Sequence, residues 1–128
     1  MKKILLVLFL FAHSFLMAQQ IYNAAGKLVG KVNENCFYNA SGKLLGKVDG
    51  VFVYNAAGKL LGKVDGVYLY DENGKLIGKI DENNLYDALG RKMASVSDKF
   101  LYDGYGRKIR KFDGLTKSQI IIYYYYFY

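Results

Sequence analysis

One pattern recurs six times in this chain at a fixed step of sixteen residues: an apolar residue, a tyrosine, Asn or Asp, two further residues, then Gly and a cation. A short fixed period of this kind indicates that one small unit was copied and stacked along the chain. The repeat therefore constrains the architecture more than any other feature of the sequence. Its six tyrosines are Tyr22, Tyr38, Tyr54, Tyr70, Tyr86 and Tyr102.

Each unit contains two turns and no helical pattern. In the third copy, residues 55–58 begin with Asn and end with Gly, which is typical of a type I turn. Asp65 and Gly66 then favour a tight hairpin turn. No apolar spacing of three and four residues is sustained, and Gly recurs inside the units, so helix is disfavoured. Each unit is predicted to supply two short strands of an all-β antiparallel meander.

Closing the chain at the second turn of each unit gives five hairpins between two half-units. The half-units are Ile21-Tyr22 at one end and residues 107–113 at the other. Pairing of these two half-units is expected to close a ring and to remove the exposed strand edges of an open meander. The five predicted hairpins span residues 27–39, 43–55, 59–71, 75–87 and 91–103.

The second strand of each unit departs from simple alternation. Two apolar rows stand three residues apart, which would place them on opposite faces of a regular strand. A glycine lies between them in the first four copies, and this predicts a bulge or sharp bend that turns both rows toward one core. The rows are Val29, Leu45, Leu61, Ile77, Met93 and Ile109, and Val32, Val48, Val64, Ile80, Val96 and Phe112.

Residues 1–18 have the features of an export signal. Lys2 and Lys3 precede the apolar stretch 4–12, which is too short to span a bilayer, and Ala18 stands at the expected cleavage site. We therefore divide the chain into a signal peptide (1–18), a hairpin-repeat domain (19–114) and an apolar aromatic tail (115–128). The expected location is the periplasm, the outer membrane or the medium.

Composition narrows the chemistry. His13 is the only histidine, so cleavage of the signal leaves no histidine, which removes most hydrolase mechanisms and most transition-metal sites. Cys36 is the only cysteine and is interpreted as a small apolar filler. The formal charge of +7 falls to +5 without Lys2 and Lys3. Acidic polysaccharide or lipid headgroups fit that charge, whereas export argues against nucleic acid.

The units from Tyr38 to Asp49 and their neighbours resemble the bacterial five-fold beta-flower proteins. This resemblance covers residues 21–113 and implies a pseudo-five-fold antiparallel meander of short β-hairpins in an exported protein; it implies no catalytic or binding residue. The last two copies depart from the pattern, since Ala94 and Arg110 replace Gly, and we expect these copies to cap the ring. Residues 85–91 and 101–107 also resemble the YD repeats of large bacterial shell-forming toxins and adhesins.

Two repeated rows are candidates for binding, and each has a structural interpretation. The tyrosine row resembles a stacking platform for sugar rings, but tyrosines next to apolar residues are more often packing residues. The cations fit a polyanion, although Asp two positions after Lys partly cancels their charge in the middle copies. Asp71-Glu72-Asn73-Gly74 and residues 81–84 lack the ligand spacing of a calcium loop. The cations are Lys27, Lys43, Lys59, Lys75, Arg91 and Arg107, with Lys31, Lys47, Lys63, Lys79 and Lys111.

The tail ends in nine uninterrupted apolar residues, 120–128. Thr116 and Gln119 have capping-box spacing, which permits a short helix, while the Ile and Tyr content favours a strand. We expect the tail to plug the apolar mouth of the ring; oligomerisation, membrane association and a sorting signal stay open.

Together these observations predict a non-enzymatic structural or binding module of the cell envelope, with no catalytic residue, metal or cofactor. Envelope polysaccharide or another envelope protein is the expected partner. A glycan- or polyanion-binding, lectin-like role is the alternative, and an Asp- or metal-dependent enzyme is the less favoured one.

Overall fold

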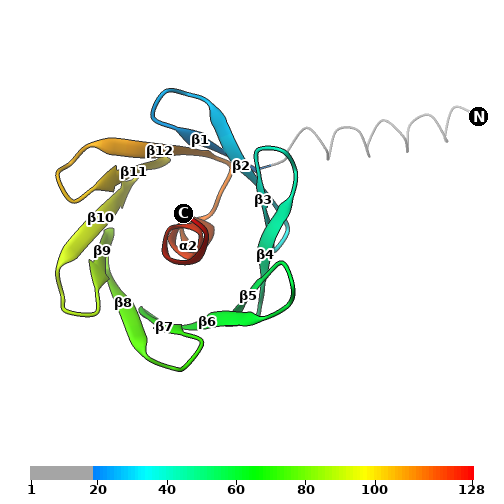
Figure 1. Ribbon diagram of the computed structural model, residues 1–128. Coiled ribbons are helices and arrows are strands. Elements are labelled where there is room, and N and C mark those ends of the chain that lie inside the picture. The colour runs from blue at the N-terminus through cyan, green and yellow to red at the C-terminus, as the bar shows by residue number, and fades with distance from the viewer. Residues whose placement is uncertain (1–18) are drawn as a thin grey trace, which may run out of the picture.

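The computed structural model describes residues 19–128, which form one closed antiparallel barrel of twelve strands around a central helix (Figure 1). The predicted signal peptide, 1–18, lies outside the described residues. The strands are β1 (Gln19–Asn23), β2 (Leu28–Asn33), β3 (Cys36–Asn39), β4 (Leu44–Asp49), β5 (Phe52–Asn55), β6 (Leu60–Asp65), β7 (Tyr68–Asp71), β8 (Leu76–Asp81), β9 (Asn84–Asp87), β10 (Lys92–Ser97), β11 (Phe100–Asp103) and β12 (Lys108–Asp113).

The strands follow one another around the barrel in chain order, and β1 pairs with β12. Ile21 stands opposite Phe112, and Tyr22 opposite Lys111. The expected closure by the two half-units is therefore confirmed. All five hairpins joined by the second turn are present. The β1–β12 pair takes the corresponding place in the remaining unit, and because no turn links its two strands it is held by hydrogen bonds and packing alone.

The first turn of each unit forms a petal that projects from the barrel wall, as Figure 1 shows. In the third copy the Asn55 side-chain oxygen accepts hydrogen bonds from the backbone N–H groups of Ala57 and Lys59, both at 2.9 Å. Gly58 closes the turn with φ of 82°, a left-handed conformation that glycine adopts without steric cost. The same two bonds to the Asn or Asp recur in all six copies, which confirms the predicted turn chemistry.

The predicted bulge is present in every unit. Phe37 pairs with Gly46 while Tyr38 pairs with Leu44, so Leu45 is the extra residue on β4. The same register shift occurs within the strand pairs of the other five petals. Because the bulge reverses the facing of the strand, Leu45 and Val48 both pack against the core, although they stand three residues apart.

The tail forms a helix on the barrel axis (Figure 1). Helix α2 (Lys117–Ile122) begins with a capping box between Thr116 and Gln119, and it continues into the wider π-helix η1 (Tyr123–Phe127). A strand there is excluded because every strand of the closed barrel already has two partners, whereas a helix satisfies its own backbone groups. The side chains of Ile120, Ile121, Ile122 and Tyr123 are buried in the core cluster. We call residues 117–128 the plug.

The seam can be tested by comparing a residue beside it with its counterpart inside the ring. Ile21 on β1 and Leu69 on β7 are both almost fully buried, at 1% and 0% exposure. We expect Ile21→Ala and Leu69→Ala each to lower the free energy of unfolding by about 2 to 5 kcal/mol, because each leaves a core cavity. Urea denaturation would measure both.

The exposed Val51 supplies the control, and Val51→Ala should change the free energy of unfolding by less than about 0.5 kcal/mol. An Ile21→Ala effect as small as that of Val51→Ala would mean that the ring is open in solution.

Candidate functional site

The centre of the barrel is occupied by the plug, whose successive aromatic residues face successive units of the wall. Tyr125 lies over Gly78 on β8, Tyr126 over Gly62 on β6, and Phe127 over Gly46 on β4. Each step of one residue along the plug thus matches a step of sixteen residues along the wall. A π-helix has more residues per turn than an α-helix, so its successive side chains are separated by smaller angles and suit a ring of many units.

Glycine is required at these wall positions because plug rings and, at Gly46 and Gly62, a backbone carbonyl oxygen occupy the place of a side chain. A Cβ atom added to Gly62 would clash with the Tyr70 carbonyl oxygen and lie 2.7 Å from Tyr126 Cε1, and one added to Gly78 would lie 2.8 Å from the Tyr125 hydroxyl oxygen. Both distances are shorter than real Cβ contacts. These glycines, predicted only to permit a bulge, therefore also form the seats of the plug, which sequence reasoning missed.

Two plug hydroxyls also bond to the wall. The Tyr125 hydroxyl donates to the carbonyl of Tyr86 at 2.6 Å, and the Tyr126 hydroxyl donates to the carbonyl of Tyr70 at 2.8 Å. Burial raises the pKa of Tyr126 to about 12 and moves the pKa of Tyr125 further above its ordinary value. Both side chains therefore stay neutral hydrogen-bond donors at neutral pH.

The last two units replace the wall glycine, and the plug contacts change there. Ala94 stands in the fifth unit and is fully buried. Arg110 stands in the sixth, where its Nε atom donates to the Tyr123 hydroxyl at 3.1 Å and its guanidinium carbon lies 4.5 Å from the centre of the Tyr128 ring. Arg110 therefore contacts the plug through its side chain. The expectation that these two copies cap the ring is wrong, because both form the same bulged petals as the other units in a closed barrel.

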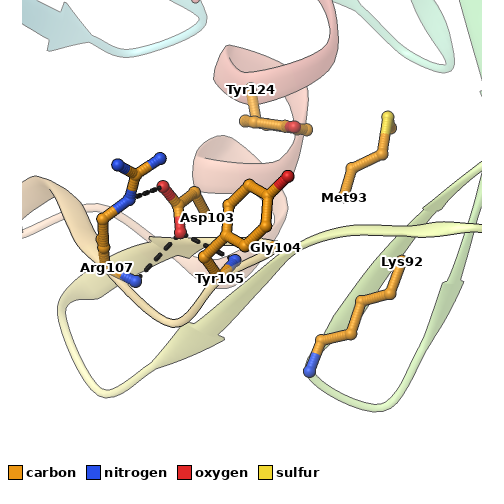
Figure 2. Close-up of a pocket in the computed structure, with 7 residues that line it drawn as sticks. All are labelled: Lys92, Met93, Asp103, Gly104, Tyr105, Arg107 and Tyr124. Atoms are coloured by element: carbon orange, nitrogen blue, oxygen red, sulfur yellow. Dashed lines mark hydrogen bonds and ion pairs between the residues drawn. The ribbon is translucent and has the colours of Figure 1, made fainter.

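A pocket of about 560 Å³ lies where these altered units meet the plug (Figure 2). Asp103 and Arg107 come from the last petal and form an ion pair with a 2.7 Å separation of Nε and Oδ2. The backbone N–H of Arg107 is the main cause that lowers the pKa of Asp103, and its side chain adds to this. The pocket is lined by Lys92, Met93, Asp103, Gly104, Tyr105, Arg107 and Tyr124.

The repeated tyrosines and lysines face each other on the outside of the barrel. Tyr54 pairs with Lys47, Tyr70 with Lys63, and Tyr86 with Lys79, and all six tyrosines of the row are half-buried. We call this outer band the tyrosine-lysine face. Two smaller grooves on it, of about 250 and 230 Å³, include the Tyr70–Lys63 and Tyr86–Lys79 pairs.

The acidic turns make local hydrogen bonds. Asp71 accepts from the backbone N–H groups of Asn73 and Lys75, both at 2.9 Å, which is turn chemistry. Within residues 19–128, no three His, Cys, Asp or Glu side chains are grouped so that they could hold a metal ion. Cys36 is a half-buried free thiol on β3. None of the helices in this part of the chain has the length and apolarity needed to cross a membrane.

Comparison with known families gives one result. The model of a family described as 5-fold beta-flower protein matches residues 18–128, which includes every strand and the plug. Comparison with curated proteins and with solved structures gives no match.

The seating of the plug predicts a strong coupling between Gly78 and Tyr125. Gly78→Ala is expected to lower the free energy of unfolding by about 1 to 3 kcal/mol, because its methyl group would overlap the Tyr125 ring. In a Tyr125→Ala background the same substitution should cost much less, since the ring is gone. Chemical denaturation of the four proteins in the cycle would measure the coupling.

A matched control replaces a plug ring that lies over another glycine. In a Phe127→Ala background, Gly78→Ala should keep its full cost, because Phe127 lies over Gly46 and stacks on Phe37. Equal costs of Gly78→Ala in all three backgrounds would contradict the seating.

Proposed function

Because this chain belongs to the 5-fold beta-flower protein family, we propose that it is a small exported module of the bacterial cell envelope that acts by binding or scaffolding and not by catalysis. The observation that carries this proposal is the filled centre of the barrel. The plug buries Ile120 to Tyr123 inside the ring and bonds to its wall, so the interior serves the fold. Interaction with other molecules then falls to the outer surface.

The chemistry of the pocket between the last petal and the plug supports a non-catalytic role. Asp103 is the only carboxylate among its lining residues. Its oxygens accept from the Arg107 side chain and from two backbone N–H groups, and these bonds lower its pKa. A carboxylate so held is a weak proton acceptor and is poorly suited to general base catalysis.

Export is the part of the proposal that rests on residues 1–18. A positive start, an apolar run and a small residue before Gln19 are the features that export machinery recognises. We propose that the processed chain resides in the periplasm, at the outer membrane or in the medium.

Export predicts a processed chain that begins near Gln19. We expect mass spectrometry of the protein from envelope and medium fractions to show loss of residues 1–18. A variant that lacks residues 2–12 should stay in the cytoplasm because it has no apolar run. An intact chain with Met1 in the cytoplasmic fraction, with the envelope fractions empty, would overturn the export proposal.

Glycan or polyanion binding is a second candidate, and the tyrosine-lysine face favours it. There the half-buried tyrosine rings stand beside cations; Lys63 Nζ lies 5.8 Å from the centre of the Tyr70 ring, and Lys111 Nζ lies 5.8 Å from that of Tyr22. Aromatic faces suit sugar rings, and lysine ammonium groups suit anionic groups.

A glycan and lipid array probed with the processed chain at two salt concentrations would test this candidate. We expect bound acidic glycans to be retained at low salt and to lose affinity at high salt, because exposed charges are screened. Retention of neutral glycans at both salt concentrations would assign binding to the tyrosines instead. An array without any bound glycan at low salt would reject the second candidate.

A further inference from the structure

The seating of plug rings on wall glycines ends at the fifth unit, where Ala94 takes the place of glycine. Tyr125 and Tyr126 lie over Gly78 and Gly62 and donate to carbonyls of the neighbouring strands. The same step around the ring would place Tyr124 over residue 94. That residue is Ala94, which is fully buried. Among residues 19–128, no hydrogen bond joins the Tyr124 hydroxyl to another group.

Three further departures from the repeat line the same pocket as Tyr124. Lys92 stands where Leu60 and Leu76 stand in the two preceding units, so an ammonium replaces an apolar side chain. Gly104 stands in the turn position that holds Ala56 in the third unit, and it contributes no side chain to the pocket. All of these positions line the pocket of about 560 Å³, whereas the grooves of the preceding units measure about 250 and 230 Å³.

Tyr105 is the third departure, and it presents an aromatic face at the mouth of the pocket. Its side chain is 88% exposed, the highest exposure of the large apolar residues in the described chain. The Arg107 guanidinium lies 5.3 Å from the centre of the Tyr105 ring and is itself held by Asp103. Figure 2 shows the rings of Tyr105 and Tyr124 entering the pocket from the petal and from the plug. An exposed aromatic face is suited to stacking on the apolar face of a sugar ring.

The pocket therefore combines groups that recognise a sugar bearing a negative charge. Tyr105 offers an apolar face, the Tyr124 hydroxyl can bond to a sugar hydroxyl, and Lys92 can pair with an anion. Burial raises the pKa of Tyr124, so its hydroxyl keeps its proton at neutral pH. The only carboxylate of the pocket, Asp103, is already neutralised by Arg107, so Lys92 leaves the pocket positively charged.

We propose that this pocket binds an anionic sugar residue, with Lys92 pairing its acidic group and Tyr105 stacking on its ring. The inference rests on the proposed function as a non-catalytic envelope module, and it assigns the ligand to the petal side of the fifth and sixth units. The acidic group is a carboxylate or a phosphate, since Lys92 supplies a single point charge that suits both.

Isothermal titration calorimetry tests the proposal with trigalacturonate as the probe. The protein is purified in the form that accumulates in cells and is not truncated further. Maltotriose is the neutral control, and glucose 6-phosphate supplies the phosphate arm. We expect an anionic probe to bind at least about tenfold more tightly than maltotriose, because it alone pairs with Lys92. Tighter binding of glucose 6-phosphate would identify the acidic group as a phosphate, and tighter binding of trigalacturonate would identify it as a carboxylate.

Three variants locate the binding. Lys92→Leu and Tyr105→Asn introduce the residues that stand at the matching positions, Leu76 and Asn73, so both should fold normally. Each should weaken binding by about tenfold or more, since each removes one of the two main contacts. Lys63→Ala on the tyrosine-lysine face is the matched control and should change the affinity by less than about twofold.

Two results would overturn the proposal. In one, neither anionic probe binds more tightly than maltotriose. In the other, Lys63→Ala weakens binding while Lys92→Leu and Tyr105→Asn do not, which would move the site to the tyrosine-lysine face and leave the second candidate function standing. Export is measured separately, so failure of this pocket and failure of the envelope proposal are distinguishable.

Discussion

The packing of aromatic plug residues against a wall of glycines is the contact on which the rest of the structure depends. Eight strands already make a barrel whose interior is just filled by its own side chains, and twelve strands enclose a wider space. The short apolar side chains of the wall, such as Val53 and Leu69, cannot fill it alone. The plug supplies the missing volume, and Gly46, Gly62 and Gly78 give it room. The number of strands, the glycines of the wall and the aromatic residues of the plug therefore depend on one another.

That constraint also explains why the candidate pocket lies where it does. Plug rings are seated on the glycines of the second, third and fourth units, whereas the atoms nearest the Cβ position of Gly30 in the first unit belong to Tyr38 and Ile21. Ala94 stands at the wall position of the fifth unit, and there Tyr124 lines a cavity and makes no hydrogen bond to the wall within residues 19–128. Arg110 restores a contact in the next unit by bonding to the Tyr123 hydroxyl. The cavity thus follows from a local loss of repeat symmetry that the neighbouring unit partly offsets.

Most of the fold could be predicted from the sequence because its signals are local. The turn from Asn55 to Gly58, the bulge beside Leu45 and the capping box of Thr116 each involve residues close together in the chain. Ring closure could be predicted because the half-units at both ends are complementary. The seating of Tyr125 over Gly78 could not, because the two are far apart in sequence and a glycine signals only what its own backbone permits. The pocket depends on that seating, so it too was missed.

The β1–β12 seam has a consequence for the order of events during synthesis. A ribosome makes β1 long before β12, and the plug residues follow β12. Until then the barrel has no partner for β1 and nothing to fill its centre, so the early units remain an open chain with exposed strand edges. Completion of the native structure therefore waits for the plug residues, and a chaperone that holds open chains would meet this protein before β12 and the plug have been made.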